Sequence, residues 1–361
     1  MRFGAHVFGY TDAESWARKH VEHGYGATYF PLSYRDAPEK IDAYVDAARR
    51  HNLVIAEIGI WNNQLDRDPA KREQYFHDAV EQFKLADRIG ARCCVNIAGS
   101  LADTWDGPHP DNLTDENFNV IVRNIQAIID AAKPKNCYYT LEPMPWMFPR
   151  NVEDMWRLIK AVDRDAFAVH ADMCNMVNSF DLVYHTGDLV RSFFSEFGKL
   201  IRAVHAKDTV LGKHLTLHIS EAIPGDGVFD YDALLTECNK LDPDLPVMAE
   251  HLETEEQYLR ATSHFQKKAA ELEQKLRSSK FTLQDFYDQL VQLKSMGNLQ
   301  DMLGMMPGMG NLKNVEVDEK AMGRTEAIIL SMTPYERENP NVLNHSRKRR
   351  IAAGAGVPVE E

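Results

Sequence analysis

The chain has 361 residues, 44% of them hydrophobic and 26% charged, which is an ordinary globular composition with room for two domains or one large barrel with an appendage. It contains no run of 18 apolar residues, which excludes a membrane-spanning helix, and its N-terminus lacks the basic and apolar stretches of a secretory signal. The five cysteines form an odd set without CxxC spacing. Such a set is typical of reduced thiols, so we expect a cytoplasmic protein.

Charge and residue types are distributed unevenly along the chain. The net charge is −13, yet the residues from Lys267 onward contain 14 Lys and Arg against 13 Asp and Glu, so the excess of acid lies before them. All five tryptophans and all five cysteines also lie in that first part, whereas five of the 14 methionines fall between Met296 and Met309. This shift in composition predicts two modules, residues 1–266 and 267–361.

The first module alternates short apolar runs with longer amphipathic stretches. The runs are nearly continuous in apolar residues, as in strands covered on both faces of a parallel sheet. They span residues 3–8, 27–31, 53–60, 92–97, 137–142, 167–172, 201–206 and 247–250. Helix-start signals stand at Thr11-Asp12, Pro69 and Thr114. Eight such pairs predict an α/β fold, a (β/α)₈ TIM barrel, and no GxGxxG motif supports an open doubly wound sheet.

The predicted strands end in polar residues, and the last four end in groups that can bind a metal. These are Glu142, Asp172, His205 and Glu250. Active sites of such barrels lie at these strand ends, and buried acids need a positive partner. Three carboxylates with one imidazole favour one divalent ion, Mn, Mg, Co or Zn. The alternative is that each is a strand-end polar residue bonded to loop backbone.

Five segments carry a resemblance to a known family. They are TLEP at 140–143, VHAD at 169–172, AVHAKD at 203–208, AIPGDGVFDYDAL at 222–234 and VMAEH at 247–251. Together they resemble the xylose-isomerase-like barrel superfamily of sugar and sugar-phosphate isomerases and epimerases. The resemblance implies that Glu142, Asp172, His205 and Glu250 hold a catalytic divalent metal, with Mn favoured. It also implies that Glu142 and Glu250 exchange the proton beside a carbonyl, through an enediolate.

Residues near the same strand ends are candidates for contacting a sugar-like substrate. They are His6, Trp61, Asn175 and Lys207. Asn175 departs from the pattern, because many relatives have His there, and this leaves inosose-dehydratase-like and C-glycoside-deglycosidase-like chemistry open as alternatives. Endonuclease IV shares the barrel but needs a trinuclear zinc cluster, and the acidic module would repel DNA, so we expect no DNA binding.

The second module has a different character. Helical spacing at residues 281–293 precedes a segment in which Met and Gly alternate, which suits a surface that accommodates varied apolar ligands. The alternative is a Met-filled core, although Pro307 and the nearby glycines disfavour a regular helix. Thr333-Pro334 is a helix-start signal, and Arg347-Lys348-Arg349-Arg350 is a basic run in a helix-turn-helix-like context that favours RNA phosphate.

The segments FTLQDFYDQL, MLGMMPGM, TEAIILSMTPYERENP and NHSRKRRIAAGAG strongly resemble the methionine-rich domain of the bacterial signal recognition particle protein. The resemblance implies that RNA is bound by Ser346, Arg347, Lys348, Arg349, Arg350 and Gly354. It implies a signal-peptide groove lined by Met296, Met302, Leu303, Met305, Met306 and Met309. His345 and Ala355 depart from the pattern. The sequence stops at VPVEE, short of the family's final helix, so we expect a truncated domain with weaker packing.

The family's GTPase motif, GxxxxGK[ST], occurs nowhere in the sequence, so a GTP-driven targeting cycle is not expected. Two hypotheses follow. In the first, the chain is a metal-dependent enzyme of carbohydrate metabolism with a fused tail, and a chimera or an accidental gene fusion is the economical interpretation. In the second, it is an RNA- and signal-sequence-binding protein and the barrel is only a fusion partner. The sequence leaves open the substrate, the choice of isomerase, epimerase or lyase, and the oligomeric state.

Overall fold

The computed structural model describes residues 1–278, 283–284, 287 and 319–359, and the chain divides into two compact units, Met1–Leu272 and Glu273–Glu361. Within the described residues, no helix combines the length and the apolar character needed to cross a membrane.

The first unit is a closed barrel of eight parallel strands in the order β1-β10-β7-β6-β5-β4-β3-β2. The strands are β1 (Arg2–Gly4), β2 (Ala27–Tyr29), β3 (Val54–Gly59), β4 (Cys93–Asn96), β5 (Tyr138–Leu141), β6 (Phe167–Asp172), β7 (Ile201–His205) and β10 (Pro246–Met248). Each lies in or overlaps one of the eight apolar runs, and each pairs with its neighbours in parallel register. The predicted (β/α)₈ barrel is therefore confirmed.

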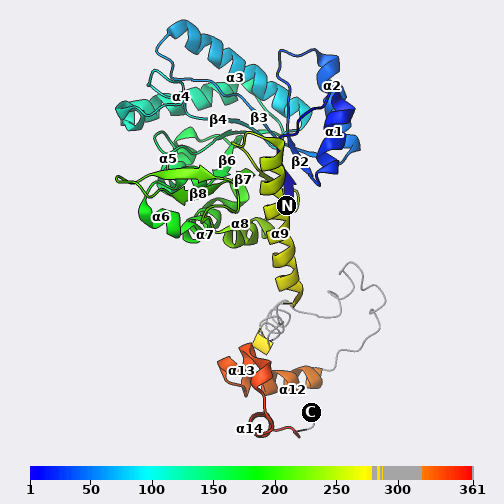
Figure 1. The fold of residues 1–361 in the computed structure, drawn as a ribbon. Coiled ribbons are helices and arrows are strands. Elements are labelled where there is room, and N and C mark those ends of the chain that lie inside the picture. The colour runs from blue at the N-terminus through cyan, green and yellow to red at the C-terminus, as the bar shows by residue number, and fades with distance from the viewer. Residues whose placement is uncertain (279–282, 285–286, 288–318, 360–361) are drawn as a thin grey trace. The chain divides into compact units, whose positions relative to one another are not determined.

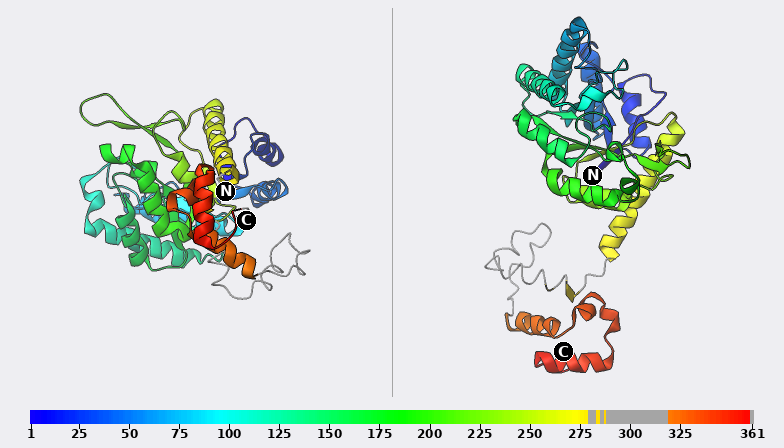
Figure 2. Two further views of the ribbon diagram at one scale, coloured as in Figure 1. Left: turned by 90° about the horizontal axis from the view of Figure 1, so that it is seen from below. Right: turned by 90° about the vertical axis from the view of Figure 1, so that its left-hand side faces the viewer.

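Helices surround the strands and cover the barrel's outer face (Figures 1 and 2). They are α1 (Ala13–Glu22), α2 (Pro38–Arg50), α3 (Pro69–Ile89), α4 (Asp115–Ala132), α5 (Val152–Val162), α6 (Phe180–Tyr184), α7 (Thr186–Phe197), α8 (Tyr231–Asn239) and α9 (Glu255–Ser278). The predicted start signals are confirmed: Asp12 and Thr114 cap α1 and α4 through side-chain oxygens, and Pro69 occupies the first turn of α3.

The barrel is held by one large apolar core between strands and helices. Trp16, Phe83, Phe193 and Phe265 are each at most 1% exposed. Burying such a side chain contributes about 1.5–3 kcal/mol, so the core fixes the strands and with them the positions of the strand ends.

An antiparallel hairpin, β8 (Asp208–Leu211) and β9 (Ile219–Ala222), follows β7 and extends outward from the barrel (Figure 1). The hairpin was not predicted. The Asp208 carboxylate anchors the hairpin by accepting hydrogen bonds from the backbone N–H groups of Thr209, Gly225, Gly227 and Phe229. A Cβ at Gly227 would lie 2.2 Å from Asp208 Oδ1, so only glycine permits this approach.

The described part of the second unit is helical, as predicted. It contains α12 (Glu319–Leu330), α13 (Pro334–Glu338), a short 3₁₀ helix (Pro340–Val342) and α14 (His345–Ala355). Thr333 caps α13 in a capping box with Glu336, which confirms the Thr333-Pro334 start signal. Ile329, Met332 and Ile351 are buried.

Candidate functional site

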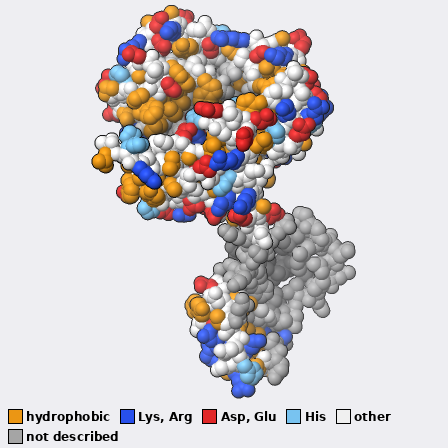
Figure 3. Space-filling view, viewed as in Figure 1, with side chains coloured by type: hydrophobic (Ala, Val, Ile, Leu, Met, Phe, Trp, Pro, Cys, Tyr) orange, Lys and Arg blue, Asp and Glu red, His pale blue; other side chains and the backbone are white. Residues whose placement is uncertain are grey.

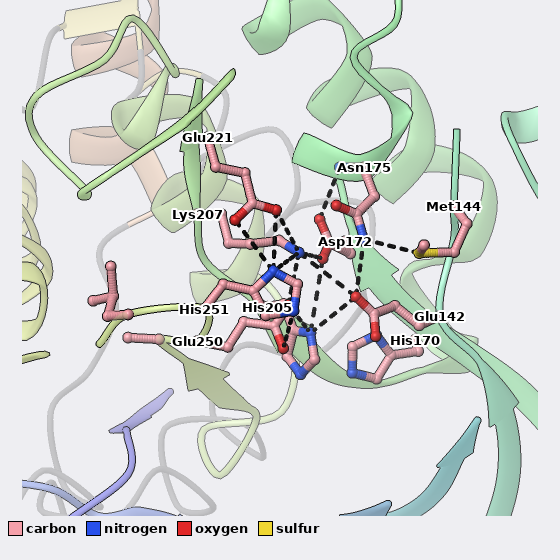
Figure 4. A network of polar contacts seen from close by, with 12 residues as sticks. Glu142, Met144, His170, Asp172, Asn175, His205, Lys207, Glu221, Glu250 and His251 are labelled. Atoms are coloured by element: carbon pink, nitrogen blue, oxygen red, sulfur yellow. Dashed lines mark hydrogen bonds and ion pairs between the residues drawn. The ribbon is translucent and has the colours of Figure 1, made fainter. Parts of the chain in front are cut away.

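Four predicted residues from consecutive barrel strands converge at one point. Glu142 follows β5, Asp172 ends β6, His205 ends β7, and Glu250 lies two residues beyond β10. Each offers one ligand atom, and these atoms all lie within 4.8 Å of one another. The residues are between 0% and 8% exposed, so the cluster is buried at the strand ends (Figure 4).

The cluster offers oxygen and nitrogen atoms that can bind a metal ion, and three of these atoms lack a regular hydrogen bond. His205 Nδ1 lies 2.8 Å from Glu250 Oε1, 3.6 Å from Glu142 Oε1 and 3.7 Å from Asp172 Oδ2. Asp172 Oδ2, His205 Nδ1 and Glu250 Oε1 are buried and form ion pairs with one another or with Lys207, but none of them has a hydrogen bond of regular geometry. Buried polar atoms almost always have a partner. Three carboxylates and an imidazole with three such atoms therefore fit a divalent cation.

Lys207 lies among the same acids (Figure 4). Its Nζ is 2.7 Å from both Asp172 Oδ2 and Glu250 Oε1 and 3.6 Å from Glu142 Oε1, as ion pairs without hydrogen-bond geometry. Burial lowers the pKa of Lys207, but the surrounding carboxylates outweigh burial and raise it well above its usual value. The ammonium group therefore remains charged and offsets part of the negative charge of the cluster.

The environment separates the pKa values of the two acids implied in proton transfer. Burial and the charge of Glu250 raise the pKa of Glu142, against the opposing effect of Lys207 and His205. Burial would also raise the pKa of Glu250, but the positive charges of His205 and Lys207 hold it well below its usual value. Two carboxylates in one site thus differ in their affinity for a proton.

A second buried carboxylate lies on the opposite side of His205. Glu57, on β3, accepts from His170 Nε2 at 2.9 Å and from His205 Nε2 at 3.2 Å. Burial would raise the pKa of Glu57, but the two imidazoles outweigh it and lower that pKa to about 2. Neither Glu57 nor His170 was among the predicted site residues, and the sequence gives no signal for this contact.

A cavity of about 470 Å³ opens beside the cluster, a volume typical of sites for small organic ligands. Its lining is mostly aromatic and acidic: His6, Tyr29, Phe30, Glu57, Gly59, Trp61, Ile97, Trp105, Asp106, Glu142, Met144, Glu250, His251 and Tyr258. Among the residues that the structure describes, this lining includes four carboxylates and neither Lys nor Arg. The cavity is thus lined largely by aromatic side chains and by carboxylates.

The four residues expected to contact substrate fall into two pairs. His6 and Trp61 line the cavity, and the His6 ring stacks on Tyr29 with centroids 4.4 Å apart. Asn175 and Lys207 instead contact the acidic cluster, and Asn175 Nδ2 donates to Glu142 Oε1 at 2.9 Å. The amide of Asn175 thus orients a carboxylate of the cluster.

Two residues at the cavity have unusual backbone conformations. Trp61 and His251 both have positive φ, 48° and 57°, although neither is glycine. Strain of this kind persists where the surroundings hold it, often at ligand sites. The Trp61 ring folds back over Gly59, where a Cβ would lie 1.8 Å from Trp61 Nε1. His251 was not among the predicted residues, although it directly follows Glu250.

The predicted RNA-binding residues of the second unit all lie on α14. Figure 3 shows Lys and Arg side chains on the described surface of this unit. Arg347 and Arg350 form ion pairs with Glu336. Lys348 and Arg349 are exposed, and no ion pair of theirs occurs within the described part of the chain. Ser346 is exposed, and Gly354 packs against Ser331, where a Cβ would lie 3.0 Å from the hydroxyl.

The residues of the expected signal-peptide groove lie outside the described residues. They are Met296, Met302, Leu303, Met305, Met306 and Met309.

Comparisons with known proteins match the two units separately. A family model described as "Xylose isomerase-like TIM barrel" matches residues 17–269, and one described as "Signal peptide binding domain" matches residues 262–361. The signal recognition particle protein of Bacillus subtilis is 54% identical over 97 residues, 26% of this chain and 22% of that protein. That of Streptococcus mutans is 51% identical over 94 residues, 25% and 18% respectively. The chain thus spans about a fifth of the length of these relatives.

Solved structures resemble the barrel in fold. A xylose isomerase-like TIM barrel protein from Mycobacterium smegmatis in complex with magnesium aligns with a TM-score of 0.53 at 15% identity, covering 73% of this chain and 90% of that one. A 3-keto-D-glucoside 4-epimerase from E. coli gives 0.55 at 15%, covering 74% and 99%. Endonuclease IV from Thermus thermophilus gives 0.56 at 14%, covering 75% and 100%. These neighbours have different activities, so the fold alone does not select one.

Proposed function

Since the chain belongs to the xylose isomerase-like TIM barrel family and carries a signal peptide binding domain, we propose that its barrel is a divalent-metal-dependent isomerase or epimerase of a sugar-like carbonyl compound. The observation that carries the proposal is the convergence of Glu142, Asp172, His205 and Glu250, with three buried atoms that lack a regular hydrogen bond. Mn is the favoured ion, and Mg, Co or Zn are alternatives.

A divalent cation held by these four residues would polarise a substrate carbonyl and stabilise the negative charge that develops on its oxygen. The two glutamates of the cluster also line the cavity, so their carboxylates can reach a substrate bound there. Glu142 and Glu250 are the candidates for removing the proton from the carbon beside the carbonyl and for returning it. Asn175 holds Glu142 in place through its amide.

The lining of the cavity favours an uncharged sugar over a sugar phosphate. Lys207 and the proposed ion offset the charges of Glu142 and Glu250 from behind the lining, but a phosphate group in the cavity would also face Asp106, and the described lining itself contains neither Lys nor Arg. Aromatic rings such as Trp61 suit the apolar face of a sugar ring.

The proposal is tested by solvent exchange. Purified chain is loaded with Mn²⁺ and incubated in D₂O with keto sugars, and deuterium in the carbon-bound positions is followed by NMR. We expect exchange beside the carbonyl that is lost in Glu142→Gln and requires metal. An isomerase or epimerase returns a rearranged sugar, whereas a lyase or a C-glycoside-cleaving enzyme releases a smaller or unsaturated product. If no divalent ion binds at millimolar supply, the enzyme proposal fails.

For the second unit we propose binding of signal recognition particle RNA, and of signal peptides. The 54% identity to the Bacillus subtilis protein over 97 residues supports the proposal, together with the exposed cations Lys348 and Arg349 on α14. Because phosphate contacts release counterions, the affinity for RNA should fall steeply with salt. Binding of the particle RNA without a salt dependence, or no binding, would reject this function.

A further inference from the structure

We propose that Glu57 is a positioning residue for the metal site, which acts by fixing the protons of His205 so that its Nδ1 lone pair faces the ion. The proposal rests on the proposed metal function of Glu142, Asp172, His205 and Glu250. Glu57 itself lies outside that set, on the far side of the imidazole ring.

Glu57 is enclosed in the barrel and shared between two rings. Its side chain is buried, with the whole residue 1% exposed, and its two oxygens have different partners: Oε2 is 2.9 Å from His170 Nε2 and Oε1 is 3.2 Å from His205 Nε2. The two imidazoles meet edge to face with centroids 4.1 Å apart. One carboxylate thus orients two rings that come from the neighbouring strands β6 and β7.

The positions of the protons follow from the chemistry of these groups. An ionised carboxylate only accepts hydrogen bonds, so the Nε2 atoms of His170 and His205 both carry a proton. An imidazole that binds a metal is neutral and carries one proton, so an ion that binds His205 replaces the proton on Nδ1 and leaves the Nε2 proton with Glu57. The Nδ1 atom faces the acidic cluster, 2.8 Å from Glu250 Oε1, and has no regular hydrogen bond.

A metal ion takes the lone pair of a neutral imidazole nitrogen, and the hydrogen bond of the other nitrogen decides which atom is available. Glu57 therefore holds the Nε2 proton and leaves Nδ1 as the atom of His205 that can bind the ion. It also places a negative charge next to Nε2, which makes Nδ1 a stronger electron-pair donor to a metal ion.

The competing interpretation is a second metal site, because the ligand atoms of Glu57, His170 and His205 also lie within 4.8 Å of one another. Hydrogen bonds already satisfy both oxygens of Glu57, whereas three atoms of the four-residue cluster have none. An ion beside Glu57 would have to displace two hydrogen bonds. One ion per chain is therefore expected.

The test compares Mn²⁺ binding by the full chain and its variants, with calorimetry and the electron paramagnetic resonance spectrum of Mn²⁺ as readouts. Glu57→Gln keeps the side-chain shape and removes the charge. Its amide can accept only one of the two hydrogen bonds from the imidazole rings. We expect its Kd for Mn²⁺ to rise about 10–100-fold, the range seen when such an outer partner is lost. The matched control is His170→Gln, which removes the other ring from the same carboxylate and should leave Kd within about threefold of wild type.

Two results would overturn the proposal: a Kd for Glu57→Gln within threefold of wild type, or an equal loss in His170→Gln. Failure of the underlying metal site is recognised separately, because wild type itself would then bind no ion.

A second measurement needs no variant of Glu57. In wild type loaded with Zn²⁺ and ¹⁵N-labelled at histidine, we expect the His205 signals to show a proton on Nε2 and the metal on Nδ1. The His205 signals are assigned by their absence in His205→Asn. Metal on Nε2, or two ions per chain by elemental analysis, would contradict the proposal.

Discussion

The barrel is recognised mainly by its fold, whereas the C-terminal unit is recognised by its sequence. The barrel shares only 14–15% identity with endonuclease IV and the keto-glucoside epimerase, yet it aligns with each over about three quarters of the chain. The C-terminal unit shares 54% identity with a signal recognition particle protein but covers about a fifth of its length. A fold can thus persist when sequence has diverged, whereas high local identity can identify one domain without the rest of the protein that carries it elsewhere.

This comparison implies that function is separable between the two units. In the barrel, function is proposed from the geometry of a few side chains. In the C-terminal unit, it is proposed from sequence identity and from charges on one helix. A variant of one unit is therefore expected to leave binding by the other unit unchanged.

The largest effect is expected from the acidic cluster. Asp172→Asn removes one carboxylate from a buried site, so the bound cation would lose one of its negatively charged partners. Such a loss costs about 3–5 kcal/mol. We therefore expect Mn²⁺ binding to weaken about a thousandfold, measured by calorimetry. Binding of RNA by the same variant should be unchanged. Equal metal binding by wild type and Asp172→Asn would remove the barrel's proposed function.

A second effect concerns the stability of the barrel in acid. His20 is 1% exposed and its Nδ1 lies 2.8 Å from the Trp16 carbonyl oxygen; burial, only partly opposed by that contact, lowers its pKa to about 4. In the unfolded chain the His20 imidazole has its ordinary pKa of about 6.5. The free energy of unfolding therefore decreases as the pH falls from about 6.5 to 4. The loss reaches about 3 kcal/mol at pH 4.

Urea unfolding followed by tryptophan fluorescence measures this loss, because all five tryptophans lie in residues 1–266. His20→Gln should flatten the pH dependence in that window by about 3 kcal/mol relative to wild type. Parallel pH profiles for the two proteins would show that His20 is not the group responsible.

A third effect concerns RNA binding by α14. Lys348→Ala combined with Arg349→Ala removes two exposed cations, and the slope of log affinity against log salt should become shallower by about 2. Filter binding at several salt concentrations measures the slope. Lys240→Ala, which removes an exposed cation of the barrel, is the matched control and should leave it unchanged. An unchanged slope in the double variant would mean that RNA does not contact these residues.

The smallest effect is expected at Glu336. Backbone hydrogen bonding from Thr333 and the side-chain contact of Arg350 lower its pKa to about 2. A lowered carboxyl pKa stabilises the fold above about pH 4.5, and this contribution is lost as the pH falls toward 2. Hydrogen exchange of α14 peptides, corrected for intrinsic rates, should show protection declining between these pH values in wild type and less so in Glu336→Gln. The same decline in both would contradict this role.

Much of the fold could be predicted because its signals are local. Continuous apolar runs identify buried parallel strands, and Asp12, Pro69 and Thr114 identify helix starts within a few residues. The convergence of the four strand-end residues also followed from topology, since all parallel strands of a barrel end on the same rim.

The rest depends on contacts between residues far apart in the sequence. Asp208 anchors its hairpin through Gly225 and Gly227, and Glu57 meets His170 across 113 residues; neither contact leaves a local pattern. The place of Lys207 among the acids likewise follows only from the assembled site. Side-chain partners of this kind need the three-dimensional structure.

The most direct test of the central claim is anomalous diffraction from crystals of the full chain grown with Mn²⁺, together with elemental analysis. We predict one ion per chain, with anomalous density between Glu142, Asp172, His205 and Glu250. Chain that binds no divalent ion at millimolar supply, or an ion bound away from these four side chains, would contradict the account.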